Sequence, residues 1–475
     1  RAGTKNADVR LGVMSASGGA TVWVDWDREQ YPYLATVKWP ENAPLTILVQ
    51  NREQTEQALL AVDDATGSTT TLLVERDDAW INLDQDMPRW LEDGSGFLWT
   101  SERSGWWRLE HRARDGSLVK ELTPAGFPLR GVVKVDEGRG LVWLSAGDDP
   151  TQTHLHRMPL AGGAPEQVTQ EPGVHGASFS KDGSVYLHSF AGMNTIGATT
   201  VRRFDGQSLG ELRSEAEALP FEVNGELVRI GRSPEFNALV IRPRNFEPGR
   251  KYPTLVSVYG GPHAQTVTAA ARNRTLNQWF ADHGFIVVSI DGRGTPSRGR
   301  DWERAIKFDL IGPALADQKT ALRALGERYP EMDLSRVGIY GWSFGGYFSA
   351  MAVMREPETF HVGVAGAPVC DWIDYDTHYT ERYLGVPDDH PDAYERSNVL
   401  TYAAGLRRPL LVVHGTADDN VYLVHSLKMT DALFRAGVPY DFLALAGQTH
   451  MVAAPEVFTP LQQRTIDYFV EHLNP

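Results

Sequence analysis

Cysteine and long hydrophobic runs are both scarce in this sequence. Cys370 is the single cysteine among 475 residues, which excludes an internal disulfide and a cysteine-based zinc site. One cysteine does not decide between a reducing and an oxidising compartment. No run of 18 or more apolar residues occurs, so we expect no membrane span within these residues.

Positive charge is also in short supply. The sequence has 46 Lys and Arg against 61 Asp and Glu, which gives a formal net charge of −15 at pH 7. A chain without a basic stripe cannot release counterions from a phosphate backbone, so we expect no nucleic-acid partner. The first residues, Arg1-Ala2-Gly3, include neither a methionine nor a signal-like apolar segment. We therefore expect a mature, processed or truncated start, which leaves the targeting of the protein open.

The length and a change of pattern predict two domains. A chain of 475 residues that is 42% hydrophobic can bury more than one core. Short β-type runs fill residues 1–215, and strands alternate with helices over residues 216–475. We therefore predict an all-β domain followed by an α/β domain.

The all-β half carries a weak repeat that favours a β-propeller over a sandwich. Asp93–Trp99, Asp136–Trp143 and Asp182–Leu187 each combine a turn with a following strand. Their spacing of about 45 residues is that of propeller blades. Residues 1–215 then hold four or five blades, so we expect only the later blades of an N-terminally truncated propeller. Thr21–Trp26 alternates polar and apolar residues, which predicts a strand.

The second half has the order of an α/β-hydrolase, a doubly wound and mostly parallel sheet. Predicted strands lie at Thr254–Tyr259, Phe285–Ile290, Val337–Tyr340, Val362–Ala365, Pro409–Val413 and Tyr440–Leu445. Pro313–Leu325 predicts an amphipathic helix. Ile466, Phe469, Val470 and Leu473 give a last helix one apolar stripe.

The centre of this half is the segment Gly341–Tyr347, a G-x-S-x-G sequence between a predicted strand and a predicted helix. That context is the one a nucleophile elbow requires. Glycines two residues either side of Ser343 allow a tight turn, which exposes the hydroxyl above the sheet. The backbone N–H of Phe344 then lies at a helix start, where it stabilises an oxyanion.

A serine nucleophile needs a base, and the base needs an acid that orients it. α/β-Hydrolases supply both from loops at the carboxyl ends of strands, in the chain order Ser, acid, His. Asp418 and Asp419 both follow Pro409–Val413; we choose Asp418 as the orienting acid and assign Asp419 a capping or structural role. His450 follows Tyr440–Leu445 and is predicted to be the base.

Three other histidines compete with His450 for the role of base. His414 lies at the end of a strand, where a structural histidine is expected. His425 lies inside a helical stretch, and His472 lies near the C-terminus. Of the four, His450 alone has the loop position that the fold requires.

The α/β half is similar to a known family. This half resembles the prolyl oligopeptidase family of serine peptidases, and within that family it resembles the bacterial type of the dipeptidyl peptidase IV branch. The resemblance covers most of residues 235–475, and the all-β half is more diffusely similar to the later propeller blades of the same family. The segments that carry the resemblance are Gly341–Tyr347, His414–Val421, Val258–Pro262, Asp291–Gly294 and Ala367–Tyr383.

The resemblance implies that Ser343, Asp418 and His450 form a catalytic triad, and we expect neither a metal nor a cofactor. It also implies that the Tyr259 hydroxyl donates to the oxyanion beside the Phe344 N–H. The implied walls of the primary pocket are Val369, Trp372, Tyr375, Tyr379 and Val421, with Asn420 as a polar neighbour. Flat aromatic walls accept a proline ring through dispersion and area burial, whereas longer or branched side chains would clash.

Three features depart from the family pattern. Phe344 stands where a tyrosine usually follows the nucleophile, and Thr449-His450-Met451 replaces the usual Asp-His-Gly. Dipeptidyl peptidases of this family hold the amine of the substrate with a glutamate pair, and this sequence contains no Glu-Glu dipeptide. In the family that pair lies upstream of the part that matches Arg1–Asn6.

The resemblance implies a serine exopeptidase that releases Xaa-Pro or Xaa-Ala dipeptides from free peptide N-termini. The alternatives on the same scaffold are a tripeptidyl peptidase, an acylaminoacyl peptidase and a prolyl endopeptidase. An alternative of another class is an inactive propeller fragment that serves as an interaction platform. The resemblance further suggests a homodimer that is periplasmic or secreted.

Overall fold

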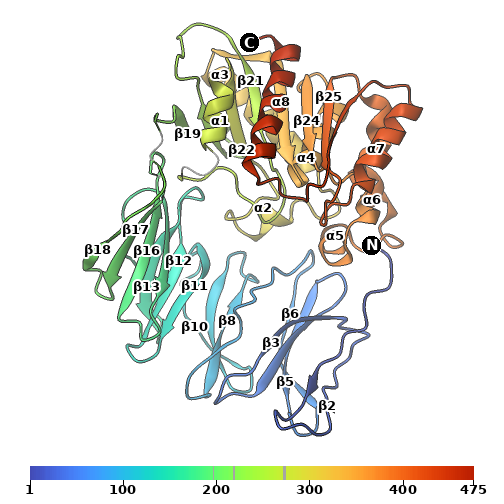
Figure 1. Cartoon of the computed structure of the whole chain (residues 1–475). Helices are drawn as coiled ribbons and strands as arrows, with labels where there is room; N and C mark the ends of the chain where they lie inside the picture. The colour runs from blue at the N-terminus through green and yellow to red at the C-terminus, as the bar shows by residue number, and fades with distance from the viewer. Residues whose placement is uncertain (196, 218–219, 271–273) are drawn as a thin grey trace.

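The computed structural model describes residues 1–195, 197–217, 220–270 and 274–475. Figure 1 shows two parts: antiparallel sheets that stand side by side, coloured from blue to green, and a larger sheet with helices on both faces, coloured from yellow to red. These parts confirm the predicted fold class, a β-propeller domain followed by an α/β-hydrolase domain.

Within the described residues, the propeller part has four four-stranded antiparallel sheets and one two-stranded ribbon, β1 (Gly12–Val13) with β2 (Val22–Trp23). Four full sheets agree with the four or five blades that the repeat predicts. The sheets are β3 (Tyr33–Lys38), β4 (Leu45–Gln50), β5 (Glu56–Val62) and β6 (Thr69–Arg76); β7 (Arg89–Trp90), β8 (Gly96–Ser101), β9 (Arg108–Ala113) and β10 (Leu118–Glu121); β11 (Leu129–Asp136), β12 (Leu141–Ala146), β13 (His154–Pro159) and β14 (Glu166–Gln167); and β15 (Val174–Phe179), β16 (Val185–Ala191), β17 (Ala198–Arg203) and β18 (Ser208–Leu212).

The prediction of one strand over Thr21–Trp26 is only partly right. Its side chains do alternate between more exposed and more buried positions, but only Val22–Trp23 pairs within the ribbon. The N–H of Asp25 donates instead to the carbonyl of Gly67, on another hairpin. The chain therefore leaves the ladder at a point that the alternation does not reveal.

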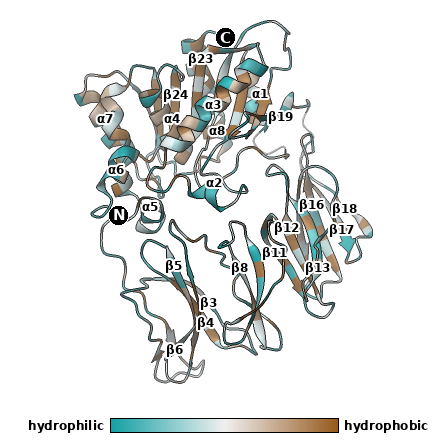
Figure 2. Cartoon of the chain, turned by 180° about the vertical axis from the view of Figure 1, so that it is seen from behind, coloured by the Kyte–Doolittle hydropathy of each residue, from teal (hydrophilic) through white to brown (hydrophobic). Residues whose placement is uncertain are grey.

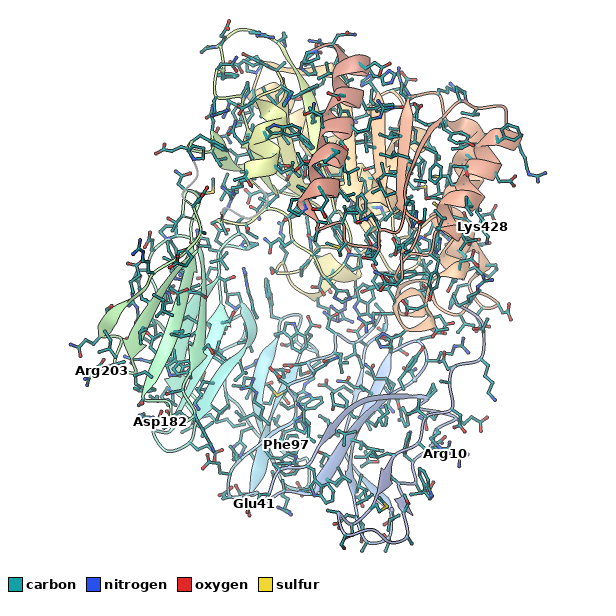
Figure 3. All side chains as sticks on the ribbon, in the orientation of Figure 1. Arg10, Glu41, Phe97, Asp182, Arg203 and Lys428 are labelled. Carbon is teal, nitrogen blue, oxygen red and sulfur yellow. The ribbon has the colours of Figure 1, made fainter. Side chains whose placement is uncertain are left out.

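The propeller part follows ordinary rules of side-chain placement. Phe97 on β8 is completely buried, whereas the charged residues Asp182, in the turn before β16, and Arg203, the last residue of β17, lie exposed at one end of the last sheet (Figure 3). In the turn before β16, Asp182 Oδ1 accepts the N–H of Ser184 at 3.1 Å, and Gly183 has a φ of 66°. Asp followed by Gly is typical of such a turn because glycine enters the left-handed region without steric cost.

The hydrolase part is built on an eight-stranded sheet in the order β19-β20-β22-β21-β23-β24-β25-β26. β19 and β20 pair antiparallel to their neighbours, and all other pairs are parallel. The predicted boundary at residue 215 lies in the connection between β18 and β19. The strands are β19 (Gly225–Ile230), β20 (Phe236–Ile241), β21 (Tyr252–Ser257), β22 (Ile286–Asp291), β23 (Met332–Trp342), β24 (Val362–Gly366), β25 (Leu410–Gly415) and β26 (Asp441–Leu445).

Helices cover both faces of this sheet. α1 and α8 share one apolar core with it, and α3, α4 and α7 share the other. The central strands are therefore hydrophobic along much of their length, as Figure 2 shows from behind. The helices are α1 (Arg274–Ala281), α2 (Arg300–Arg304), α3 (Gly312–Arg328), α4 (Phe344–Arg355), α5 (Thr377–Leu384), α6 (Pro391–Ser397), α7 (Val424–Arg435) and α8 (Pro455–Leu473), with 3-10 turns η1 (Trp372–Asp374) and η2 (Val399–Gly405).

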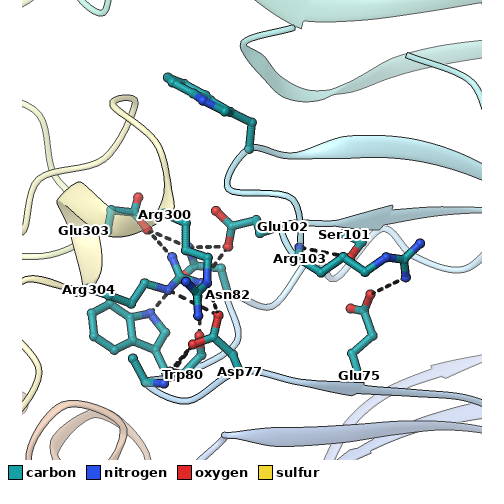
Figure 4. A network of polar contacts seen from close by, with 12 residues as sticks. Glu75, Asp77, Trp80, Asn82, Ser101, Glu102, Arg103, Arg300, Glu303 and Arg304 are labelled. Carbon is teal, nitrogen blue, oxygen red and sulfur yellow. Dashed lines mark hydrogen bonds and ion pairs between the residues drawn. The ribbon is translucent and has the colours of Figure 1, made fainter. Parts of the chain in front are cut away.

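The two parts meet in a charged network beside α2 (Figure 4). Arg304 Nη2 lies 2.8 Å from Glu102 Oε2 of the propeller and donates to the carbonyl of Trp80 at 3.0 Å. The Asn82 amide donates to Glu102 at 3.0 Å and to Glu303 at 2.7 Å. Charged side chains from both domains are thus paired across the boundary, where an unpaired charge would be costly.

Candidate active site

The candidate nucleophile lies in a strained turn between β23 and α4. Ser343 has φ 61° and ψ −117°, a conformation that a non-glycine residue seldom adopts. Added Cβ atoms on Gly341 and Gly345 would collide with the carbonyl oxygen of Val258. These glycines are therefore required by close backbone contact, and the N–H of Phe344 begins the helix directly after the serine.

The candidate acid and base form a short, buried contact. His450 Nδ1 lies 2.8 Å from Asp418 Oδ2. The Oδ1 atom of Asp418 accepts the N–H groups of Asn420 and Val421 at 3.0 and 2.9 Å. Because an ionised carboxylate only accepts hydrogen bonds, His450 Nδ1 is the donor and Nε2 is left as the basic nitrogen. The neighbouring carboxylate, Asp419, is exposed and makes no such contact.

All three candidate residues follow strands of the parallel sheet. Ser343 follows β23, Asp418 follows β25 and His450 follows β26, so each lies at the carboxyl edge of the sheet. The indole N–H of Trp342 donates to the carbonyl of His450 at 2.8 Å. This contact ties the residue before the serine to the loop that carries the histidine.

Among the other three histidines, His414 also touches the candidate acid, with its Nε2 3.3 Å from Asp418 Oδ2. His414 is completely buried; its Nδ1 pairs with the Ser426 hydroxyl at 2.7 Å and its Nε2 with the carbonyl of Val421 at 2.7 Å. His425 is buried within α7. His472 is exposed near the end of α8.

Tyr259, the candidate oxyanion donor, follows β21 and lies half-buried beside the elbow. Its ring centroid is 5.8 Å from that of Phe344. Burial raises the pKa of the Tyr259 phenol, so the hydroxyl stays protonated and able to donate at neutral pH. The Phe344 ring packs so closely on Gly261 that a Cβ there would collide with it.

The candidate pocket residues form an aromatic cluster between η1 and α5. The rings of Trp372 and Tyr379 are stacked with centroids 5.9 Å apart, and Tyr375 meets the Tyr379 ring edge-on at 5.4 Å. The Tyr375 hydroxyl donates to Asn420 Oδ1 at 2.8 Å. Two of the candidate walls are almost fully buried aliphatic side chains, Val369 and Val421.

Sequence reasoning missed some residues that support this cluster. Tyr347 on α4 meets the Trp372 ring edge-on at 5.2 Å, and its position four residues after Ser343, one helical turn on, was the available signal. Glu381 on α5 is completely buried and pairs with Arg52 of the propeller at 2.6 Å. No local pattern could have revealed a pair separated by more than three hundred residues.

In the part of the chain that the structure describes, no three or more His, Cys, Asp and Glu side chains are grouped so that they could hold a metal ion. In the same part, no helix combines the length and the apolar character needed to cross a bilayer. The candidate residues, a hydroxyl, an imidazole and a carboxylate with backbone and phenol donors, suit acyl transfer through a covalent intermediate.

Comparisons with known proteins find relatives of both halves of the chain. Among solved structures, the dipeptidyl peptidase 4 of Porphyromonas gingivalis superposes with a TM-score of 0.92 at 27% identity, covering all of this chain and 68% of that one. Among curated proteins, dipeptidyl peptidase 8 of Mus musculus is 28% identical over 97% of this chain and 60% of its own length. A probable dipeptidyl-aminopeptidase B of Emericella nidulans is 30% identical over 100% of this chain and 55% of its own length.

This chain therefore spans little more than half the length of these curated relatives. Residues 1–196 match the family described as the dipeptidyl peptidase IV N-terminal region, and residues 272–475 match the prolyl oligopeptidase family. With both halves matched in the same order and the fold shared over the whole chain, the chain belongs to the prolyl oligopeptidase family, in its dipeptidyl peptidase IV branch.

Proposed function

We propose that this protein is a serine exopeptidase that releases Xaa-Pro or Xaa-Ala dipeptides from the free N-termini of peptides. The observation that carries the proposal is the buried Asp418–His450 contact at the edge of the sheet that also bears the strained Ser343 turn. The names of the relatives, dipeptidyl peptidase and dipeptidyl-aminopeptidase, support the same class of reaction.

In the proposed mechanism, His450 Nε2 takes the proton from Ser343 as the serine oxygen attacks the carbonyl carbon after the second substrate residue. The Phe344 N–H and the Tyr259 hydroxyl stabilise the resulting oxyanion. His450 then gives its proton to the leaving amine, and a water that it deprotonates hydrolyses the acyl-enzyme. Asp418 holds the imidazole in the required tautomer throughout.

Substrate choice is proposed to come from the aromatic cluster. The walls are Val369, Trp372, Tyr375, Tyr379 and Val421, with Asn420 beside them; they form a largely apolar cluster whose aromatic rings suit a proline ring. None of these residues is acidic, so a basic residue at the cleavage site finds no counter-charge among them.

Labelling with a fluorophosphonate tests the catalytic assignment. We expect wild-type protein to be labelled and Ser343→Ala to remain unlabelled. Equal labelling of both would refute Ser343 as the nucleophile. No labelling of a folded full-length wild type would instead favour the inactive interaction platform.

A paired assay tests the exopeptidase assignment. Full-length protein should hydrolyse Gly-Pro-anilide and leave its N-acetylated form intact, because a dipeptidyl peptidase binds the free amine. Cleavage of the blocked substrate would favour an acylaminoacyl peptidase or a prolyl endopeptidase. Cleavage of a tripeptidyl anilide alone would favour a tripeptidyl peptidase.

We further propose that the protein is a homodimer, periplasmic or secreted. Exposed apolar side chains on two helices support the dimer: Leu427 and Phe434 on α7, and Phe458 and Val470 on α8. Sedimentation velocity of the full-length protein tests the assembly, and cell fractionation tests the compartment. A monomer at micromolar concentration, or protein confined to the cytoplasm, would contradict the respective part.

A further inference from the structure

His263 lies four residues after the candidate oxyanion donor, Tyr259, in the connection that follows β21. It is an exposed residue, yet its ring nitrogen Nε2 is held by two side chains of α5. Arg382 Nη1 lies 3.1 Å from this nitrogen, and the Tyr383 hydroxyl forms a short hydrogen bond with it. The loop of Tyr259 is therefore fastened to the helix that also carries the pocket wall Tyr379.

These contacts fix the state of the imidazole. A guanidinium group has only donors, so a nitrogen that pairs with Arg382 must be an acceptor. His263 Nε2 is then unprotonated, the ring is neutral, and its proton is on Nδ1. The Tyr383 hydroxyl accordingly donates to the same Nε2, so two donors from successive residues of α5 share the single lone pair of this nitrogen.

His263 is also strained. Its φ of 65° lies in the left-handed region, which is unfavourable for a residue with a side chain. Such a conformation persists only where the surroundings enforce it, and it concentrates at functional sites. The loop between Tyr259 and His263 is short and includes Gly260, which itself has a φ of 71°. Because only three residues separate them, a displacement of His263 also displaces Tyr259.

Arg382 also forms a hydrogen bond with a residue of the propeller, Gln54. Gln54, in the connection from β4 to β5, accepts from Arg382 Nε at 2.5 Å and donates to the carbonyl of His378 at 2.5 Å. Gln54 is completely buried and also has a positive φ, 59°. The Arg382 guanidinium therefore contacts two residues with a left-handed backbone conformation, Gln54 of the propeller and His263 of the hydrolase part.

We propose that His263 is a positioning residue that sets the Tyr259 hydroxyl relative to the pocket on α5. Through Arg382 and Gln54 it couples that placement to the propeller blade of β3–β6. The inference rests on the proposed function, because it takes Tyr259 to be the oxyanion donor. It adds that the oxyanion donor, the pocket wall and the propeller are held together as one unit.

A matched pair of variants in the full-length protein tests this. His263→Leu removes the acceptor, whereas His263→Gln offers an amide oxygen near the position of Nε2, and both keep a side chain at the same φ. We expect His263→Leu to lower kcat on Gly-Pro-anilide by about 10- to 100-fold, the range typical of a misplaced catalytic group. KM should change by less than about threefold, and His263→Gln should recover most of kcat.

The same variants in a Tyr259→Phe background separate positioning from general damage to the fold. Once the hydroxyl is gone, His263→Leu should lower kcat by no more than about twofold, since residues that act as a unit are non-additive. Each rate is divided by the concentration of sites that react with a fluorophosphonate, which removes the effect of misfolded protein. If His263→Leu lowers kcat by 10- to 100-fold in both backgrounds, the proposal is overturned. It is also overturned if His263→Leu leaves kcat unchanged while Tyr259 is present.

A p-nitrophenyl ester keeps this test independent of the peptidase assignment. Ester hydrolysis by the same serine needs the same oxyanion donor but no dipeptide recognition. If the ester is cleaved and Gly-Pro-anilide is not, the proposed exopeptidase function fails while the coupling between His263 and Tyr259 is still measured on the ester. Additive losses on the ester would overturn the positioning role alone.

Discussion

The Nδ1 atom of His450 lies 2.8 Å from Asp418 Oδ2, and the Asp418 side chain has no exposed surface. The other carboxylate oxygen accepts two backbone N–H groups, so the carboxylate cannot rotate away from the ring. A fixed, buried acceptor at Nδ1 selects the tautomer whose Nε2 can accept a proton from serine. This arrangement makes the acid as important to the proposed chemistry as the base.

Asp418→Asn should lower kcat by about 10⁴-fold, because the amide can present a donor to His450 and favour the wrong tautomer. Steady-state hydrolysis of Gly-Pro-anilide measures the loss. Asp419→Asn is the matched control, since it makes the same change one residue along in an exposed position. We expect that variant to stay within about twofold of wild type. Equal losses in both variants would contradict the assignment of Asp418.

Tyr259→Phe should lower kcat by about 10²–10³-fold, the usual effect of losing one oxyanion donor. The ring that packs 5.8 Å from Phe344 is kept, so the fold should not change. KM should change little, since the hydroxyl acts mainly in the transition state. Tyr402→Phe serves as the control, because it removes a hydroxyl of η2 that donates to the carbonyl of Arg396 on α6. Wild-type turnover in Tyr259→Phe would contradict its role.

Local signals in the sequence were enough for much of the fold and for the position of the elbow. Ser343 is recognisable because the glycines, the strand before them and the helix after them are all neighbours in the chain. The choice between Asp418 and Asp419 could not be made in the same way. Both follow the same strand, and only the path of the loop decides which carboxylate reaches His450.

The contacts around α5 were beyond sequence reasoning for a different reason. Arg382 pairs with Gln54 and His263, which are distant in the chain and come from different domains. Gln54 is not among the residue types enriched at positive φ, so nothing local predicts its left-handed conformation. Periodicity predicts which face of an element is buried, but it does not predict which polar side chains meet across a domain boundary.

Glu381→Gln should lower the stability of the folded protein by about 2–3 kcal/mol. Glu381 is completely buried, and it accepts from Arg52 Nε at 2.6 Å and Nη2 at 2.7 Å and from the N–H of Gly3 at 2.8 Å. The neutral amide weakens these charge-assisted bonds and turns a donor toward Arg52.

Urea denaturation of the full-length protein measures the effect through the midpoint of the transition. Glu356→Gln makes the same substitution in an ion pair with Lys319, whose side chains are 31% and 25% exposed. We expect that control to cost at most about 1 kcal/mol. A smaller loss for Glu381→Gln than for Glu356→Gln would show that the contact between the propeller and α5 adds nothing to stability.

Glu303, in the network of Figure 4, should make stability fall as pH rises toward neutrality. Burial, and next the charge of Glu102, raises the pKa of Glu303 from 4.5 to about 7. Between pH 4.5 and about 7 the folded protein therefore holds a proton at Glu303 that the unfolded chain has released. The stability supplied by this proton is complete below pH 4.5, is lost through that window and is absent above it.

Glu303→Gln removes the titration and keeps an oxygen that can accept from Asn82, as Glu303 does at 2.7 Å. At pH 8 the variant should be more stable than wild type by up to about 3 kcal/mol, and at pH 4.5 the two should be nearly equal. Denaturation midpoints at both pH values test this, with Glu327→Gln on the exposed side of α3 as the control for losing one negative charge. If wild type and Glu303→Gln lose the same stability between the two pH values, the carboxyl of Glu303 does not hold that proton in the folded protein.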